Sequence, residues 1–398
     1  MKWKMIGNLV GAVLLIAILI FSAYTLVPFV RYLSIPITGG TKAPAFQESP
    51  ETAKINTENK QNYFNTKAMG NGKTMVSNIS EVPNQGGWLN TAPLNLKVLA
   101  AEDKLLLINF WSSTDLRSYR STVFMETLWQ RYKNYGLVVI GVDAPEFDFE
   151  ENPVNVLNAI HEQDITYPVV TDAKKEIWKK FGNHFVSAHY LIDRRGEVVY
   201  SHFGEQNYTE EEQLIRQQLM SYGWHLPTYP PLPALLQPDF RTQQTPSLYV
   251  GPVFIRRELG ADPQPIRGRT ANYAFPSIIL PDRVYLAGTW KADSDYLQAM
   301  TPAKVTVRYT ASTAYVVLAQ AIHPIWVEVQ MDNAPVPVAM RGSSIVERKG
   351  KTYMQVVQPG LYFPLADNAP YGQHILTLIT PAGLNLYAFK FAVYPAQG

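Results

Sequence analysis

The residues best placed to do chemistry in this chain are Asp115 and Ser118, which stand close together in the stretch INFWSSTDLRSY (108–119). The apolar start of this stretch predicts a buried strand, and the polar turn after it leads into a predicted helix. A carboxylate at this point could act as an acid or a base together with Arg117 or Glu146. It could also accept hydrogen bonds from the free N–H groups of the first helical turn, where the helix dipole favours an anion. We expect the capping role.

The absence of cysteine from all 398 residues removes several kinds of chemistry. Disulfide exchange proceeds by attack of a thiolate on sulfur, and neither the Asp115 carboxylate nor the Ser118 hydroxyl can replace the thiolate. Iron–sulfur clusters and cysteine-based zinc sites are excluded for the same reason. The sequence also contains no glycine-rich phosphate loop, no G-x-S-x-G motif and no sign of a serine triad. We therefore predict that the chain binds no cofactor and is not an enzyme.

The histidines give no support to a metal site. No two of them have H-x-x-x-H spacing on a predicted helix, and no carboxylate cluster surrounds any of them. His189 and His202 could approach each other across a predicted hairpin, where we expect packed histidines rather than metal ligands. The seven positions are His161, His184, His189, His202, His225, His323 and His374.

Residues 86–222 alternate between buried strands and amphipathic helices. The continuous apolar runs LLLINFW (105–111) and LVVIGVD (137–143) predict strands that are covered on both faces. Between them, STVFMETLWQRYKNYG (121–136) has helical spacing and ends on a glycine that can cap the helix. A hairpin across DRRG (193–196) precedes the last helix. This alternation, which ends in an antiparallel hairpin, predicts an α/β domain of thioredoxin type.

Residues 248–398 change to short alternating strands separated by Pro, Gly, Asp and Asn, which predicts an all-β sandwich or jelly roll. In PIWVEVQMD (324–332), strict alternation places Trp326, Glu328 and Gln330 on one face of a strand. A tryptophan among polar neighbours suits stacking on a sugar ring or contact with a protein surface, although a second sheet could equally cover it. The opposite face carries Ile325, Val327, Val329 and Met331, and we expect Trp290 to lie in the core as well.

The N-terminal segment predicts a membrane anchor. Residues 5–30 carry no charge, and a helix of this length can cross a bilayer core of roughly 30 Å. Lys2 and Lys4 precede it, so the positive-inside rule places residues 1–4 in the cytoplasm and the bulk of the chain outside. A cleaved signal peptide is the alternative. Its apolar region usually runs about 7–15 residues and ends in small residues, whereas a cut after the FSA tripeptide here would leave bulky Phe21 at the third position back.

Two segments are predicted to be connectors. Residues 31–85 are rich in Asn, Thr, Lys, Gly and Gln with few apolar clusters, which predicts a flexible tether. Residues 223–247 contain LPTYPPLPALLQP, whose prolines block helix formation and predict a semi-rigid linker.

Several blocks of sequence resemble the periplasmic part of the DipZ family, in which a thioredoxin-like (TlpA/redoxin) domain precedes a β domain like a carbohydrate-binding module. The resemblance over residues 87–220 is specific, because its blocks occur in order at the expected spacing. That over the β domain is weaker. The blocks are GWLNTAPL (87–94), YGLVVIGVDAPEFDFE (135–150), ITYPVVTDAKKEIWKKFGN (165–183), AHYLIDRRGEVVYSHFGE (188–205), YTEEEQLI (208–215), LYVG (248–251), YLAGTW (285–290), VQMDNAPV (329–336) and LYAFKF (386–391).

The family's redox turn and its cis-proline are both replaced here. The family pattern runs from a tryptophan, which is Trp111 in this chain, to a C-x-x-C pair, whose positions are taken by Asp115 and Ser118. The family's cis-proline position is Ser187. Because a cis bond before a residue other than proline costs about 2.5–4 kcal/mol, we expect a trans bond at Ser187 and a reshaped loop. We expect Trp111 to serve packing rather than recognition.

These features predict a single-pass inner-membrane protein of a Gram-negative-like bacterium, with a redox-inactive thioredoxin-like domain and a β module in the periplasm. We expect non-catalytic binding of a protein partner in the envelope, with Trp326, Glu328 and Gln330 as possible ligand-binding residues. Two alternatives are an accessory of thiol–disulfide or cytochrome c maturation that transfers no electrons, and an envelope glycan-binding protein. The net charge of +2, with no basic stripe, gives no support to nucleic-acid binding.

Overall fold

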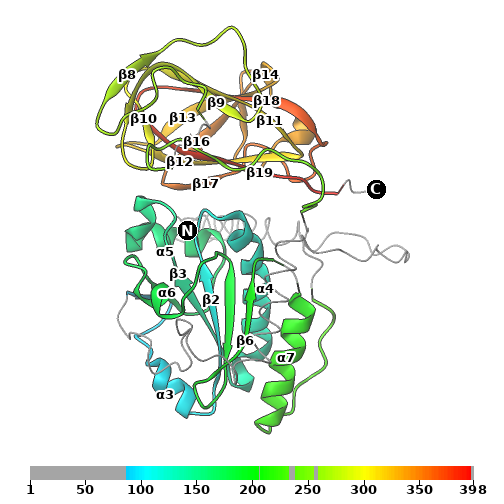
Figure 1. Ribbon diagram of the computed structural model, residues 1–398. Coiled ribbons are helices and arrows are strands. Elements are labelled where there is room, and N and C mark those ends of the chain that lie inside the picture. Colours follow the sequence, from blue (N-terminus) through cyan, green and yellow to red (C-terminus); the bar gives the residue numbers. More distant parts are fainter. Residues whose placement is uncertain (1–86, 206, 233–237, 255–258, 396–398) are drawn as a thin grey trace, which may run out of the picture. The chain divides into compact units, whose positions relative to one another are not determined.

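The computed structural model describes residues 87–205, 207–232, 238–254 and 259–395. The predicted N-terminus, anchor and tether (1–4, 5–30 and 31–85) lie outside these residues. Among the described helices, none combines the length and the apolar character that crossing a membrane requires. The described residues form two domains, which fall within one compact unit of the chain (Figure 1).

The first domain contains a six-stranded mixed sheet. Strands β2, β3 and β4 are parallel to one another, whereas β1, β5 and β6 run antiparallel to their neighbours. All seven residues of β2 are buried, as its uninterrupted apolar sequence predicts. In spatial order the strands are β1 (Trp88–Leu89), β4 (Val169–Thr171), β3 (Leu137–Asp143), β2 (Leu105–Trp111), β5 (Ala188–Ile192) and β6 (Val198–Phe203).

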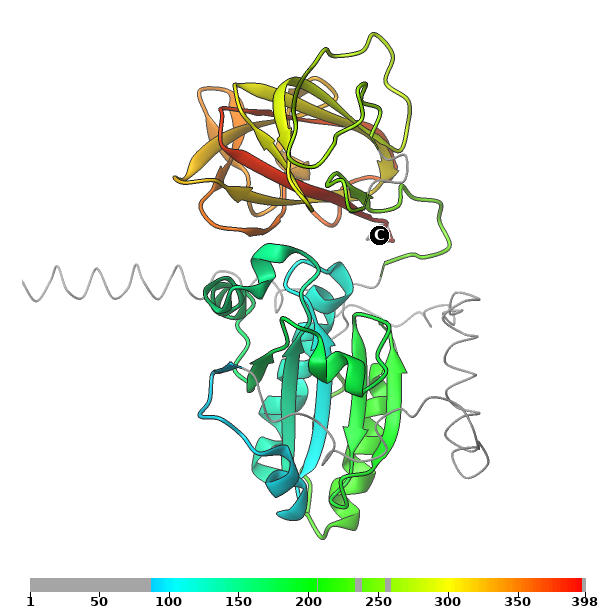
Figure 2. The same ribbon diagram turned by 60° about the vertical axis from the view of Figure 1, so that its left-hand side comes forward.

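Helices cover both faces of this sheet. One apolar cluster joins the sheet to α4, α5 and α7, and a second cluster on the other face joins it to α3 and α6. This two-sided cover confirms the expected thioredoxin-like α/β architecture (Figure 2). The helices are α3 (Leu96–Ala101), α4 (Leu116–Tyr132), α5 (Pro153–Glu162), α6 (Glu176–Lys180) and α7 (Tyr208–Ser221), with short 3-10 turns η2 (Lys133–Tyr135) and η3 (Asp148–Glu151).

The second domain is all-β, as predicted. Its strands form a continuous network that folds around one large apolar core. Strand β9 (Arg283–Ala292) pairs with β11 along its first half and with β8 and β10 along its second half. It therefore connects the part of the strand network that contains β11 with the part that contains β8 and β10. Gly288 lies at this change of partner with φ +91°, a conformation that favours glycine, and such bends let a strand pass from one sheet to another.

The remaining strands of this domain are β7 (Leu248–Tyr249), β8 (Thr270–Tyr273), β10 (Leu297–Ala299), β11 (Ala303–Ala311), β12 (Thr313–Gln320), β13 (Ile325–Met331), β14 (Ala334–Pro335), β15 (Val346–Arg348), β16 (Lys351–Val356), β17 (Gly360–Tyr362), β18 (Gly372–Thr380) and β19 (Leu384–Ala392), with η4 (Val338–Met340) between β14 and β15. Trp290 is buried in the core, as expected.

The described parts of the linker are attached to the domains at both ends. The Tyr229 hydroxyl donates to the carbonyl of Arg131 in α4 at 2.7 Å, and Arg216 of α7 donates to the Pro227 carbonyl at 3.1 Å. Toward the other end, the Thr245 N–H donates to the carbonyl of Thr310 in β11. The prolines prevent regular structure, but hydrogen bonds to both domains hold the described parts of the segment.

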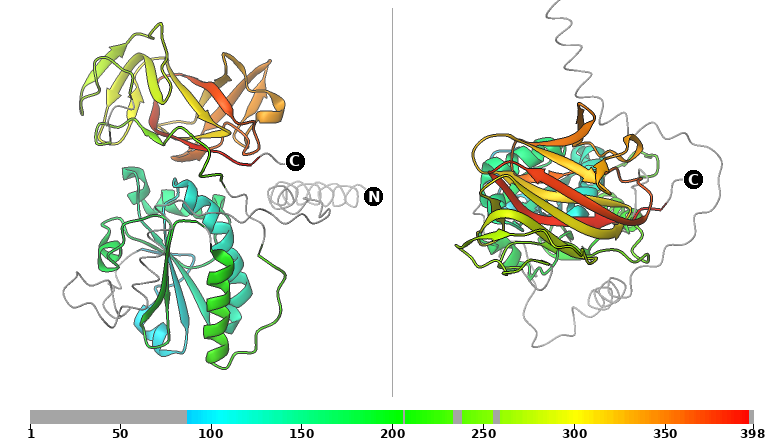
Figure 3. Two further views of the ribbon diagram at one scale, coloured as in Figure 1. Left: turned by 45° about the vertical axis from the view of Figure 1, so that its right-hand side comes forward. Right: turned by 90° about the horizontal axis from the view of Figure 1, so that it is seen from above.

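Apolar side chains also join the two domains to each other. Phe147, in the loop after β3, packs against Val317, Tyr387 and Ala388 of the β domain. Leu116, the first residue of α4, packs against Tyr315, Ala392 and Tyr394. These contacts lie just beyond the ends of β2 and β3, at the first residue of α4 and in the loop after β3. Figure 3 shows the elements of both domains from two further sides.

Candidate functional site

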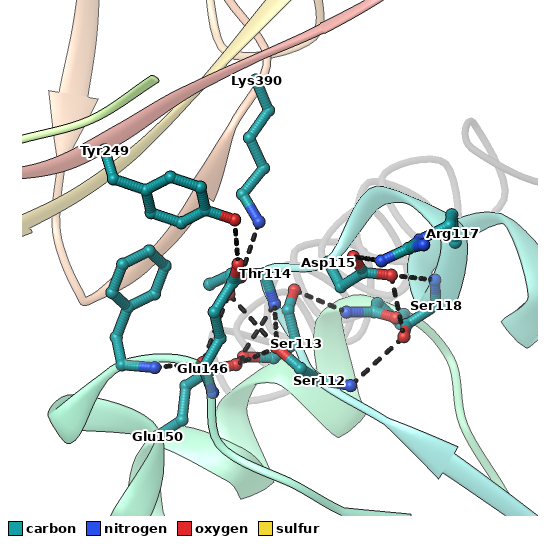
Figure 4. A network of polar contacts seen from close by, with 12 residues as sticks. Ser112, Ser113, Thr114, Asp115, Arg117, Ser118, Glu146, Glu150, Tyr249 and Lys390 are labelled. Atoms are coloured by element: carbon teal, nitrogen blue, oxygen red, sulfur yellow. Dashed lines mark hydrogen bonds and ion pairs between the residues drawn. The ribbon is translucent and has the colours of Figure 1, made fainter. Parts of the chain in front are cut away.

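The turn after β2 is a helix cap. Asp115 is the N-cap of α4, and its Oδ1 accepts hydrogen bonds from the Ser118 N–H at 2.9 Å and the Ser118 hydroxyl at 3.3 Å. Ser118 is fully buried, and its Oγ accepts from the Ser112 N–H at 3.3 Å (Figure 4). The two residues at the family's cysteine positions thus satisfy each other and the helix terminus, which is the arrangement expected for Asp115.

The charge state of Asp115 gives no support to general acid catalysis. Burial raises the pKa of its carboxyl, but the positive charges of Arg117 and Lys390 and the Ser118 N–H lower it, and the net shift is downward. The Arg117 guanidinium lies 3.3 Å from Oδ2. An ionised carboxylate with a lowered pKa has no proton to donate near neutral pH and is a weak base.

Glu150 organises the loops around this turn. Its carboxylate is fully buried and connects the turn after β2 with the loop after β3. Burial and the nearby Glu146 raise its pKa, and the hydrogen bonds from Ser113, Ser112 and Phe147 oppose that shift. Its donors are the hydroxyls of Ser112 at 2.8 Å, Ser113 at 2.7 Å and Thr114 at 3.2 Å, and the N–H groups of Thr114 at 3.2 Å, Glu146 at 2.8 Å and Phe147 at 3.0 Å.

Glu146 extends this network into the β domain. It accepts hydrogen bonds from the Tyr249 hydroxyl at 2.5 Å, from Lys390 Nζ at 2.5 Å and from the Thr114 hydroxyl at 3.0 Å (Figure 4). The Lys390 side chain is 3% exposed and that of Glu146 is 20% exposed. We call these four residues the Glu146 clasp. It is a largely buried ion pair with further hydrogen bonds, and it links the turn after β2 to strands β7 and β19.

Two polar groups near the turn have no hydrogen-bond partner among the described residues. They are Nε1 of Trp111 and the carboxyl of Asp143, at neighbouring positions of β2 and β3. Burial raises the pKa of Asp143 well above its usual value, and the negative charges of Glu150 and Asp172 add to the shift. Trp111 is fully buried, which fits the packing role expected for it.

The bond before Ser187 corrects one expectation. The Val186–Ser187 peptide bond is cis, so the prediction of a trans bond was wrong. That prediction considered only the missing proline. In the structure the Ser187 carbonyl accepts from the Gly204 N–H at 2.8 Å, and its hydroxyl lies 3.0 Å from His189 Nε2 and 3.3 Å from the Ser121 hydroxyl. These tertiary contacts hold the residue in place and cannot be read from its type.

Ser187 belongs to a buried Ser–His–Glu chain that the sequence analysis missed. His189 Nδ1 lies 2.9 Å from Glu211 Oε2, and His189 Nε2 faces the Ser187 hydroxyl. Serine proteases use the same order of groups. Here all three side chains are fully buried, so a substrate cannot reach the hydroxyl. The only local signal was the alternation that puts Ser187 and His189 on one face of a strand, because Glu211 comes from α7.

The expected approach of His189 and His202 is confirmed, with ring centroids 6.0 Å apart. No group of metal-ligating side chains forms among the residues that the structure describes.

The outer face of β13 has the predicted alternation. Val327, Val329 and Met331 are buried, whereas Trp326, Glu328 and Gln330 are half-buried on the other face. The Arg348 guanidinium lies 3.5 Å from the Trp326 ring centroid. Glu328 pairs with Lys351 at 2.9 Å and accepts a hydrogen bond from Gln330 at 2.8 Å. One side of the indole is therefore already occupied by a cation.

Comparison with known proteins shows what the two domains are similar to. Residues 39–219 match the sequence model of redoxin, and residues 245–392 match that of a thioredoxin like C-terminal domain. DipZ proteins of Mycobacterium bovis and Mycobacterium tuberculosis are 32% identical to this chain over 242 residues, which covers 58% of the chain. The chain is homologous to DipZ. It spans 34% of the length of those DipZ proteins.

Two other curated proteins are also similar to the chain. The chloroplastic protein SUPPRESSOR OF QUENCHING 1 of Arabidopsis thaliana is 25% identical over 224 residues, covering 56% of this chain and 20% of that protein. Thiol-disulfide oxidoreductase ResA of Bacillus thuringiensis is 29% identical over 113 residues, covering 28% of this chain and 62% of that protein. The resemblance to DipZ that the sequence blocks indicated is confirmed, and the lack of cysteine fits the loss of the C-x-x-C motif.

Proposed function

We propose that this chain is a membrane-anchored, non-catalytic binding or scaffold protein of the bacterial envelope, with its folded part in the periplasm. The observation that carries the proposal is the replacement of the two cysteines by Asp115 and Ser118 in a turn whose polar groups are used within the chain. Without a thiolate the domain cannot exchange disulfides. The turn at the former redox position instead contacts the β domain, through the packing of Leu116 and through the Glu146 clasp.

The anchor is supported by the sequence alone. Residues 5–30 carry no charge, and Lys2 and Lys4 precede them, which favours a cytoplasmic N-terminus and a periplasmic bulk.

The nature of the partner is supported by the relatives and by the β13 face. ResA carries the name of a thiol-disulfide oxidoreductase, which favours an accessory role beside enzymes of that kind, without electron transfer. A glycan is the second candidate, because Trp326 remains partly exposed among polar groups. The Arg348 guanidinium over the indole disfavours a sugar on that side of the ring and favours contact with a protein.

Two measurements on the full chain in membranes test this proposal. Insulin reduction with a dithiol donor should proceed at the rate of the donor alone, and any additional turnover would refute the non-catalytic assignment. Cross-linking followed by mass spectrometry should recover the same envelope protein from wild type and from Ile322→Ala, an exposed control, but not from Trp326→Ala. Glycan-array binding that needs Trp326 would favour the glycan instead, and equal recovery from all three proteins would remove the β13 face from the site.

A further inference from the structure

An apolar segment lies exposed on the outer face of the β domain. Residues 274–281, AFPSIILP, follow β8 and form neither helix nor strand. Phe275, Ile278 and Leu280 are 38%, 70% and 48% exposed. Ile379 of β18, which pairs with Lys304 of β11, is 37% exposed. Contiguous apolar side chains on a surface indicate an interaction site.

The segment is held in place along its length. The Leu280 N–H donates to the Tyr285 hydroxyl at 3.0 Å, and Arg308 donates to the Ile279 carbonyl at 3.3 Å. Lys304 Nζ lies 4.3 Å from the Phe275 ring centroid. The segment is therefore fixed on the sheet while its apolar side chains stay exposed.

Cations accompany these apolar side chains. Arg308 of β11 lies directly opposite Arg283 of β9, although like charges at opposed positions destabilise a sheet. Lys304 lies on the same face of β11. The ion pairs of the described residues involve other cations, so these three charges lack a carboxylate partner there. The adjacent Asp282 carboxylate instead accepts from the Thr245 hydroxyl.

We propose that this face, comprising Phe275, Ile278, Leu280, Ile379, Arg283, Lys304 and Arg308, rests on a bilayer surface that carries anionic lipid headgroups. Segments that lie at a membrane surface combine Phe and Leu side chains with Lys and Arg, whereas the cores of protein interfaces are depleted of Lys. Here the Lys304 ammonium lies over the ring of Phe275, the aromatic residue of this face. Each unpaired basic residue near an anionic leaflet strengthens binding about fivefold.

The inference goes beyond the proposed function, because an N-terminal anchor fixes only the distance of the folded part from the membrane. A lipid-binding face on the β domain would also fix its orientation.

The cysteine-free sequence allows a local test. The full chain carrying Ile278→Cys is labelled with an environment-sensitive fluorophore and reconstituted into vesicles that all contain nitroxide-labelled lipid. The vesicles consist of phosphatidylcholine either alone or mixed with phosphatidylglycerol. The matched control is Ile322→Cys, which is 80% exposed in the turn between β12 and β13. Label 278 should be quenched several-fold more strongly than label 322, and only in vesicles that contain phosphatidylglycerol. The additional changes Arg283→Gln and Lys304→Gln should reduce this quenching.

Three results would overturn the proposal. They are equal quenching at both positions, equal quenching without phosphatidylglycerol, and a shift of label 278 that depends on protein concentration rather than on lipid, which would indicate a protein partner. Flotation of the same vesicles reports separately whether the chain is anchored, so failure of the anchor and failure of this face give different results.

Discussion

The turn after β2 and the outer face of β13 both carry polar and aromatic residues, but they differ in how those residues are satisfied. At the turn, Glu150 and Lys390 are buried and bonded within the chain. On β13, Trp326 and Glu328 are half-buried and their partners Arg348 and Lys351 lie at the surface. Buried charges are costly unless paired, whereas exposed pairs contribute little to stability. The polar groups of the first region therefore depend on partners within the chain, whereas the second region leaves Trp326 and its polar neighbours partly exposed.

The largest expected effect comes from Glu150→Ala. The change leaves buried hydroxyl and N–H donors of two loops without their acceptor, so the free energy of unfolding should fall by about 3–5 kcal/mol. Denaturant unfolding monitored by tryptophan fluorescence measures the loss. The neighbouring exposed Glu151→Ala is the control and should change stability by less than about 0.5 kcal/mol. Similar losses in both variants would remove the distinction between the buried network and ordinary surface carboxylates.

Breaking the clasp should have the next largest effect. Lys390→Met keeps the volume of the side chain but leaves the Glu146 carboxylate facing Tyr249 and Thr114 without its cation, which should cost about 2–5 kcal/mol. Lys351→Met removes the corresponding pair of β13, in which the Lys351 side chain is 56% exposed, and should cost less than about 1 kcal/mol. Unfolding midpoints of the two variants, measured side by side, test the comparison directly, and an equal shift would contradict it.

The buried Asp143 carboxyl should make the stability of the protein depend on pH. Because burial raises its pKa, the folded state keeps a proton that the unfolded state has lost at pH values above its usual pKa. The free energy of unfolding should therefore fall as pH rises from the usual aspartate pKa toward the raised pKa of Asp143, by up to about 1.4 kcal/mol per pH unit. Asp143→Asn should reduce this slope and leave the smaller contribution of Glu150, whose pKa burial also raises. The exposed Asp103→Asn should keep it, and an unchanged slope in Asp143→Asn would show that another group is responsible.

The smallest effect on stability is expected at Trp326. Trp326→Ala removes a surface cation–π contact with Arg348 that is worth about 0.5–1 kcal/mol. Its thermal midpoint should stay close to that of the wild type while partner recovery is lost. A large loss of stability would mean that this face, like the turn, is structural.

The features that the sequence predicted are local or periodic. The apolar run of β2 and the alternation of β13 follow from burial on two faces or on one, and the Asp115 cap follows from the spacing of a turn before a helix. The clasp could not be predicted in this way, because Lys390 and Glu146 are 244 positions apart and meet only after both domains have folded. The same holds for Glu211, which reaches His189 from another element.

The accessibility of Leu116 tests the central claim, that the former redox turn is covered by the β domain. Since the chain has no native thiol, Leu116→Cys can be modified with a maleimide-linked polymer and compared with the exposed Ile322→Cys. The structure predicts modification at least about 100-fold slower at position 116, which corresponds to an opening free energy of about 2.7 kcal/mol, and faster modification when Lys390→Met is added. Equal rates at positions 116 and 322 would show that the turn is open to partners and would contradict the account.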